Sequence, residues 1–447
     1  MTHRTQPTVV GEPAPPTRLV RQLGTFDAVI VGLGSMIGAG IYTALAPAAA
    51  AAGEALLVGL AIAAFIAWCN AKSSAALAAL YPESGGTYVY GRKRLGPFWG
   101  YLAGWAFVIG KLASCAAMAL TFADYVAPSF ARALAAVAVA VVTLVNCRGV
   151  EKAAFATRLI VAFVLASLAV VVFAALASGG DEGLHPDAIS GAGPYGILQA
   201  AGFLFFAFAG YARIATLGEE VKNPAQTIPR AIPWALGIAL GVYALVAISA
   251  LHAVGAAALA RASAPLAVVV ETSRWPWLTP IVRAGAAVAS LGVLLSLLAG
   301  VSRTVFAMAS NGDFPAFLAR VHPRYRIPDA ALLVVGSIVV VAVLAADIRH
   351  AIGFSSFAVL MYYAIANAAA MTLDVHEPAG PPQGRIPECE ARTYSSARRG
   401  SRALAACGIG GCLLLAFSVP AGSLLGGCVL LALGAAAFFL RRERGAV

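Results

Sequence analysis

Long apolar stretches alternate with short polar ones along almost the whole chain. A helix needs about 20 apolar residues to cross a bilayer, and twelve stretches approach or exceed that length. They lie at about residues 26–50, 54–79, 98–126, 131–146, 154–178, 194–218, 231–255, 279–308, 330–346, 351–373, 403–419 and 422–440. The pattern predicts an all-α polytopic membrane protein with 12 transmembrane helices.

The composition supports this class. The chain has 447 residues, of which 60% are hydrophobic and 11% are charged, and its mean hydropathy is +0.84. No soluble domain of this length has such a composition. The first apolar run is too long for the core of a signal peptide, so we interpret it as a retained helix. The seven cysteines show neither a CxxC motif nor a metal-binding spacing.

The basic residues predict the orientation in the membrane. The net charge is +11, and most of the 31 Lys and Arg residues fall on one side when both termini are placed in the cytoplasm. Only Lys111 and Arg213 then remain within the membrane. The positive charge is therefore a signal of topology, and we expect the lipid bilayer rather than nucleic acid as the surroundings of the chain. We place the protein in the plasma membrane.

The first apolar stretch contains three glycines in seven residues, Gly34, Gly38 and Gly40. Each disfavours a helix by roughly 1 kcal/mol relative to alanine, so we expect an interruption at mid-membrane. An opened helix exposes amide donors and the positive end of a helix dipole, which favours a carboxylate. The alternative is close helix packing by small residues. The candidate substrate-binding residues here are Ser35, Met36, Ile37, Gly38, Ala39 and Gly40.

The sixth stretch has a matching feature, because Gly210 lies near its centre. The first and sixth stretches are five spans apart, so they enter the membrane from opposite sides. Interrupted helices at corresponding positions of inverted halves indicate a transporter site. The alternative for Gly210 alone is a packing glycine. The second group of candidate substrate-binding residues is Phe206, Ala207, Phe208, Ala209, Gly210 and Tyr211, and Phe205 is a further candidate for an apolar wall.

Two cations in the apolar stretches are candidates for coupling or gating. Lys111 lies in the third stretch, and a lysine at mid-bilayer costs roughly 2.5–3.5 kcal/mol on insertion scales, so we expect it to face the interior. It is a coupling group, a fixed cation that stands in for a bound metal ion, or a structural lysine bonded to carbonyls. Arg213 follows the sixth-stretch break and would either close an inner gate with Glu219 or Glu220 or form a static ion pair.

Several motifs resemble those of the amino acid–polyamine–organocation (APC) superfamily of permeases. They are GLGSMIGAGIY in the first stretch, YPESGGTYVY after the second, TLGEEVKNP followed by TIPRA after the sixth, and SR, MASNGDFP and HP after the eighth. The resemblance covers about residues 20–345. It implies a five-plus-five inverted repeat (LeuT-like) with discontinuous helices 1 and 6, two further C-terminal helices, and transport of amino acids or related amines by alternating access.

The resemblance also implies a division of the chain. The expected parts are 1–22, a flexible cytoplasmic tail; 23–178, the first inverted repeat (helices 1–5); 194–374, the second (helices 6–10); 375–402, a cytoplasmic loop; 403–440, helices 11–12; and 441–447, a cytoplasmic tail. Two features depart from the family pattern. Ala212 stands where many relatives carry an acidic residue, and the middle of the fifth stretch lacks an ionisable residue.

The positions of the acidic residues narrow the class of substrate that we expect. All 20 lie in tails, in loops or near the ends of the apolar stretches, whereas a cationic substrate would favour a buried carboxylate. We therefore expect a neutral L-amino acid as substrate, and a polyamine or cationic amino-acid permease or exchanger of the same fold is the alternative. Coupling to protons through Lys111, substrate exchange without an ion, and a sodium site formed with Ser290 and Ser296 stay open.

Other function classes find no support in the residues. The apolar stretches contain neither HExxH nor GxSxG, and the chain has no Walker A motif. Met36 alone does not make a transition-metal site at the first break. We therefore expect neither an enzyme nor a resident metal or cofactor. The oligomeric state is not predicted.

Overall fold

The computed structural model describes residues 23–81, 85–148, 154–178, 193–215, 221–373 and 388–443. These residues form helices, and within them the one β-type contact is an isolated bridge between Leu23 and Val221. The first half contains α1 (Thr25–Met36), α2 (Ala39–Ala52), α3 (Leu56–Leu80), α4 (Thr87–Leu95), α5 (Pro97–Val126), α6 (Ala131–Cys147) and α7 (Ala154–Ala177). The second half contains α9 (Pro194–Phe208), α10 (Ala212–Ala215), α11 (Pro224–Arg261), α12 (Pro265–Glu271), α13 (Thr279–Ser310), α14 (Asp329–Ala345), α15 (Ile348–Met371), α16 (Glu388–Ala416) and α17 (Ala421–Glu443).

Nine helical stretches in the described residues are long and apolar enough to cross a membrane, and three shorter apolar helices accompany them. The short ones are Thr25–Met36, Asp329–Ala345 and Ser401–Ala416. The first is short because the chain leaves helical geometry after Met36. The protein is therefore a polytopic helical membrane protein. Helix α16 begins at Glu388, inside the segment 375–402 that the sequence predicts as a loop.

The surface of the bundle is apolar. Leu144 on α6, Phe173 on α7, Leu344 on α14 and Leu433 on α17 are all more than half exposed. Exposed large hydrophobic side chains in such numbers suit contact with lipid tails rather than water. The perimeter helices thus present their apolar faces outward, as a protein in a bilayer requires.

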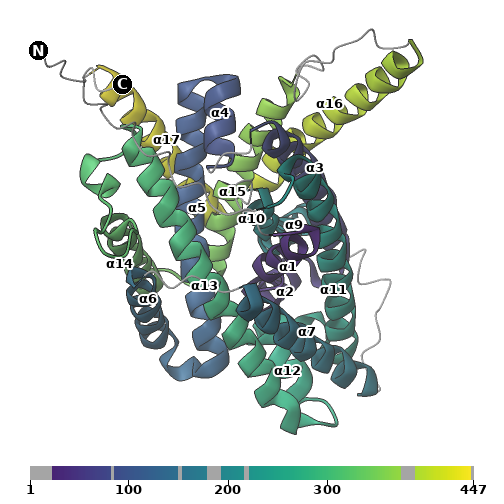
Figure 1. The fold of residues 1–447 in the computed structure, drawn as a ribbon. Coiled ribbons are helices and arrows are strands. Elements are labelled where there is room, and N and C mark those ends of the chain that lie inside the picture. The colour runs from purple at the N-terminus through teal and green to yellow at the C-terminus, as the bar shows by residue number, and fades with distance from the viewer. Residues whose placement is uncertain are drawn as a thin grey trace, which may run out of the picture.

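The helices form one elongated bundle in which α4 lies at one end and α12 at the opposite end (Figure 1). We call these the α4 end and the α12 end. Helix α5 crosses the whole bundle and packs against α13 and α15, while α2 and α3 pack against α9. Helices α6 and α14 lie side by side on one flank. Their contact is close, since a Cβ on Gly336 would lie 2.5 Å from Oγ1 of Thr143.

A buried polar contact ties α16 to the bundle. The Nδ2 of Asn367 on α15 donates to Oδ1 of Asn70 on α3 at 2.6 Å, and the Sγ of Cys412 on α16 donates to the same oxygen at 3.3 Å. All three side chains are fully buried. Hydrogen bonds between helices stabilise membrane bundles because the surrounding hydrocarbon offers no polar partners. This contact fixes the position of α15, which lines the central cavity described next.

Candidate functional site

The first apolar segment is interrupted between α1 and α2. Helix α1 ends at Met36, Ile37 takes a ψ of 52°, and Gly38 has φ −106° and ψ −146°. Helix α2 then begins at Ala39, and no side chain caps its N-terminus. The first amides of a helix have no partner within it. The interruption therefore leaves N–H donors and the positive end of α2 inside the bundle.

The sixth segment is interrupted in a milder way. Helix α9 ends at Phe208, and η3 (Ala209–Tyr211), a single 3-10 turn, connects it to α10. The amide of Ala209 still bonds the carbonyls of Phe205 and Phe206. The chain therefore tightens here, and the backbone of η3 remains close to helical geometry because a 3-10 turn keeps most of its hydrogen bonds.

The two interruptions touch each other. A Cβ on Gly210 would lie 2.1 Å from the carbonyl oxygen of Ser35 and 2.7 Å from the amide nitrogen of Met36. A Cβ on Gly40 would lie 2.7 Å from Cα of Ala207. Side chains at these positions do not fit without movement of a backbone. Close packing by small residues, the alternative to an opened site, therefore accounts for Gly40 and Gly210 directly.

A tyrosine on α11 joins the two interruptions. The hydroxyl of Tyr243 lies 2.5 Å from the carbonyl oxygen of Met36 and 3.0 Å from that of Ala207. Both carbonyls belong to helix ends, where intrahelical partners run out. Tyr243 is fully buried, so its hydroxyl supplies a donor that water cannot supply there.

A cavity of about 240 Å³ lies beside these interruptions. Eleven of the candidate residues predicted from the sequence line it. They are Ser35, Met36, Gly38, Gly40, Lys111, Phe206, Ala207, Ala209, Gly210, Arg213 and Ser296. The structure thus brings both predicted groups and both predicted cations to one place.

Four other candidates lie elsewhere. Ile37 is not among the lining residues. Phe208 packs against Tyr243, with ring centroids 5.1 Å apart, and Tyr211 stacks on Tyr363 at 5.1 Å. Ser290 donates to the carbonyl of Ala286 on its own helix. A helix presents only one face to a cavity, which is why neighbouring residues of α9 and η3 point away from it.

The remaining candidates are one further aromatic residue, the first residue of α2 and the two glutamates after the sixth stretch. Phe205 is fully buried and packs edge-on against Tyr363 at 6.0 Å, outside the cavity. Ala39 is the first residue of α2, and its side chain lies outside the described part of the chain. Glu219 and Glu220 lie outside the described residues. Of the four aromatic residues predicted from the sequence as an apolar wall, Phe206 lines the cavity.

Lys111 is the most deeply buried cation of the cavity. Its residue is 7% exposed, and its Nζ lies 6.0 Å from the centroid of the Phe107 ring. Within the described part of the chain, no hydrogen bond or ion pair to Lys111 is present, so the carbonyl-bonded lysine of the structural alternative is not what the structure has. An unpaired ammonium in a membrane interior is expensive, and such groups mark substrate or ion pathways.

The charge of the cavity wall has one sign. Lys111, Arg213 and Arg303 line it, and no Asp or Glu does so among the residues that the structure describes. An anionic group of a ligand therefore finds cations and helix-terminal amides here. A ligand cation finds only neutral acceptors, such as backbone carbonyls.

Toward the α4 end, the cavity meets a polar network centred on Tyr88. The Tyr88 hydroxyl donates to Asp313 at 2.7 Å and accepts from Arg92 at 3.0 Å and from Asn311 at 2.9 Å. Tyr88 lines the cavity, as does Arg303, whose residue is exposed. The cavity thus extends toward this end of the bundle.

Toward the α12 end, buried tyrosines close the bundle. The hydroxyl of Tyr42 on α2 hydrogen-bonds that of Ser167 on α7, and Tyr125 on α5 donates to the carbonyl of Tyr42 at 2.9 Å. The Tyr125 hydroxyl also accepts the amide of Leu266 on α12 at 3.2 Å. All four residues are fully buried. This end is therefore packed and hydrogen-bonded, unlike the α4 end.

Sequence reasoning missed several lining residues. Some had a signal: Phe107, Ser114 and Met118 lie at helical spacing from Lys111 and share its face of α5. Others had none, because Tyr88 on α4, Val293 on α13 and Tyr362 on α15 reach the cavity only through the packing of distant helices. Tyr243 likewise has no local pattern that marks it.

Comparisons with known proteins agree with this architecture. The family model described as "Amino acid permease" matches residues 23–440. The chain belongs to the amino acid permease family. This permease therefore falls within the APC superfamily that its motifs resemble, and it is a membrane protein of amino acid transport.

Individual relatives are named as transporters rather than enzymes. An uncharacterized transporter of Mycobacterium tuberculosis is 56% identical over 96% of this chain and 92% of its own length. The branched-chain amino acid permease BcaP of Bacillus subtilis is 27% identical over 70% of this chain and 72% of its own. Cationic amino acid transporter 4 of Homo sapiens is 28% identical over 80% of this chain and 60% of its own.

No metal site accompanies the cavity in the described residues. They contain no group of three or more His, Cys, Asp or Glu side chains that could hold a metal ion. Ser296, one of two serines considered for sodium, lines the cavity, while Ser290 does not.

Proposed function

We propose that this permease carries neutral L-amino acids across the plasma membrane as a secondary active transporter. The observation that carries the proposal is the cavity between the N-terminus of α2 and the sixth segment, which holds Lys111 and no described carboxylate. The substrate carboxylate binds the amides that begin α2, near Gly38 and Gly40. The substrate ammonium binds backbone carbonyls near Ala207 and Ala209.

The size and polarity of the cavity support a modest side chain. Phe206, Met118 and Val293 supply apolar lining next to the two interruptions. A volume of about 240 Å³ suits a small solute, and apolar walls with a few placed polar groups are typical of ligand sites. A branched or aromatic amino acid would place its side chain against these residues.

We infer alternating access from the difference between the two ends. The α12 end is closed by Tyr42, Ser167 and Tyr125, while the cavity extends to the exposed Arg303 at the α4 end. With both termini cytoplasmic, the α4 end faces the cytoplasm, so this arrangement corresponds to an outward-closed state. The full cycle would open the tyrosine contacts and close the α4 end, within a twelve-helix fold of two inverted repeats.

A cationic substrate is the second candidate, because one relative is named as a cationic amino acid transporter. The cavity disfavours it, since Lys111, Arg213 and Arg303 would repel a second positive charge. A pocket for lysine, arginine or a polyamine would need a carboxylate that the described lining does not contain.

The test is thermal stabilisation of the purified protein by a panel of amino acids, at pH 5.5 and 7.5, with and without sodium. A ligand that binds the native state raises the melting temperature by mass action. We expect neutral L-amino acids to raise it and their methyl esters not to, because the ester cannot accept the amide hydrogen bonds as a carboxylate does. A shift with polyamines or basic amino acids alone would overturn the substrate class and leave the fold untouched.

A further inference from the structure

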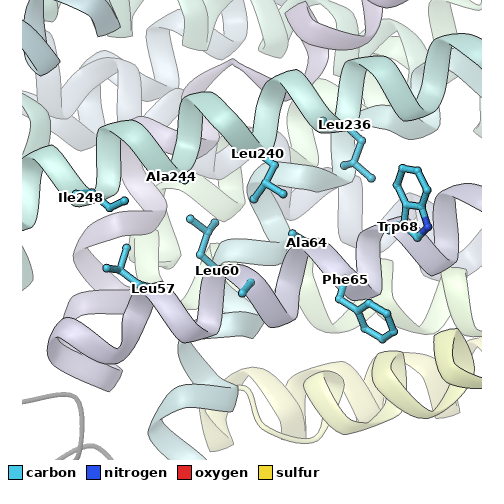
Figure 2. Close-up of a pocket in the computed structure, with 11 residues that line it drawn as sticks. Leu57, Leu60, Ala64, Phe65, Trp68, Leu236, Leu240, Ala244 and Ile248 are labelled. Atoms are coloured by element: carbon cyan, nitrogen blue, oxygen red, sulfur yellow. The ribbon is translucent and has the colours of Figure 1, made fainter. Parts of the chain in front are cut away.

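A second hollow lies on the outside of the bundle, between α3 and α11. It is a groove of about 530 Å³ whose lining side chains are apolar (Figure 2). Phe65, beside it, is 55% exposed. The lining residues are Leu57, Leu60, Ala61, Ala64, Phe65, Trp68, Leu236, Gly237, Leu240, Ala244 and Ile248.

The two helices that form the walls of the groove, α3 and α11, run antiparallel. Leu57 lies near Ile248 at one end of the groove, and Trp68 lies near Leu236 at the other (Figure 2). Trp68 follows Leu57 by eleven positions along the helix, which is about 16 Å at the helical rise of roughly 1.5 Å per residue. That length is about half of the roughly 30 Å hydrocarbon core. The groove is therefore about as long as one leaflet is thick.

Exposed cations stand beyond the Trp68 end. Lys72 follows Trp68 by four residues, which places it on the same face of α3, and its Nζ lies 4.9 Å above the Trp68 ring. Arg230 precedes Gly237 by seven residues, two helical turns, and so shares the groove face of α11. Both residues are exposed, and neither has an ion pair within the described residues.

These positions are matched along the two helices. Because α3 and α11 run antiparallel with Trp68 beside Leu236, the register places Lys72 level with about residue 232, one turn or less from Arg230. Two cations thus stand at one end of an apolar groove that is open to the bilayer. A basic site between transmembrane helices at the cytoplasmic surface is the arrangement that binds anionic lipid head groups.

We propose that this groove binds an anionic glycerophospholipid of the surrounding bilayer. One acyl chain lies between α3 and α11, against Leu60, Ala64 and Leu240, and the phosphate is held by Lys72 and Arg230. The indole of Trp68 lies between the acyl chain and the ammonium of Lys72, whose Nζ is 4.9 Å from the ring centroid. The site is separate from the central cavity and shares no lining residue with it.

The site also has a structural consequence. Helix α11 also carries Tyr243, whose hydroxyl contacts carbonyls of both interruptions. A lipid that bridges α3 and α11 would stabilise the position of α11 in the folded bundle. Binding to the native state alone raises apparent stability by mass action, independently of any substrate.

The test compares lipids added to the detergent-purified full chain. Phosphatidylglycerol, an anionic probe, and phosphatidylcholine, a zwitterionic one of the same chain length, are titrated while the melting temperature is followed. Bound lipid is counted by native mass spectrometry. We expect phosphatidylglycerol to raise the melting temperature more than phosphatidylcholine and to be retained as one molecule per chain. Equal shifts with both lipids would overturn the proposal.

Variants test the phosphate contacts and the acyl-chain groove separately. Lys72→Gln with Arg230→Gln removes the phosphate contacts and should abolish the preference for phosphatidylglycerol, while Arg442→Gln, an exposed cation on α17, should keep it. Ala61→Phe fills the groove from an exposed position and leaves both cations in place, so it should lower retention of the lipid. If the double variant and Ala61→Phe both retain the lipid and its preference as the parent does, the site is wrong. Retention by a second protein instead of a lipid would also overturn it.

Discussion

At the first interruption the chain leaves helical geometry for two residues, Ile37 and Gly38, whereas at the second it only tightens into the 3-10 turn Ala209–Tyr211. The first exposes the amides that begin α2. The second keeps its amides bonded and instead brings Gly210 against the Ser35–Met36 peptide. The two breaks are therefore not equivalent. The first supplies hydrogen-bond donors, and the second packs its backbone against the first at a residue without a side chain.

The largest effect is expected from Gly210→Val, which places carbon atoms where the Ser35 carbonyl lies 2.1 Å from an ideal Cβ. Overpacking of this kind costs about 1–3 kcal/mol of folding stability, and the displaced first interruption should lose amino acid uptake. Uptake into proteoliposomes and the melting temperature measure both effects. Gly241→Ala on α11 is the matched control, because a Cβ there meets nothing within 4 Å. If Gly210→Val kept normal uptake, the two breaks would not depend on each other.

A smaller effect is expected from removing the hydroxyl that contacts the carbonyls of both interruptions. Tyr243→Phe removes the donor that lies 2.5 Å from the Met36 carbonyl and 3.0 Å from that of Ala207. Leaving a buried acceptor unsatisfied costs about 1–3 kcal/mol, so the melting temperature should fall. Tyr363→Phe, whose hydroxyl makes a longer contact of 3.4 Å to the Ala209 carbonyl, should lower it less. Equal losses in the two variants would contradict the special position of Tyr243.

Lys111→Met tests whether the unpaired cation of the cavity serves coupling. A lysine that takes up and releases a proton during transport makes uptake depend on pH, and methionine cannot do so. We expect the variant to fold, since removal of an unpaired buried charge relieves the cost of burying it, and to show a flat pH profile of uptake between pH 5.5 and 7.5. Cys115→Ser, one turn further along α5, is the control. An unchanged pH profile in Lys111→Met would assign coupling elsewhere.

The smallest effect is expected at Ser290. Its hydroxyl bonds the Ala286 carbonyl of its own helix at 2.7 Å and does not line the cavity. Ser290→Ala should therefore change stability by less than about 1 kcal/mol and leave any sodium dependence as in the parent. A loss of sodium dependence in this variant would contradict this and place Ser290 in a sodium site on α13.

Residues near each other along the chain were predictable. Local glycine density predicted the break after Met36, and the depth of Lys111 in an apolar stretch predicted its place in the interior, because both follow from helix propensity and the cost of charge in hydrocarbon. The same reasoning did not reveal that the rings of Phe205, Phe208 and Tyr211 pack against Tyr363 and Tyr243. Which face of α9 meets a cavity depends on the rotation of the helix, and neighbouring helices set that rotation.

The membrane class, the positions of the apolar segments and the family follow from the sequence, since these depend on hydropathy and on contiguous motifs. Helix packing in three dimensions brings Gly210 against Ser35, Tyr243 to both broken segments, and Tyr88 and Tyr362 to the same cavity as Lys111. These contacts join residues far apart along the chain. Their physical cause is helix packing, in which the register and rotation of each helix depend on all of its neighbours, so no local pattern records them.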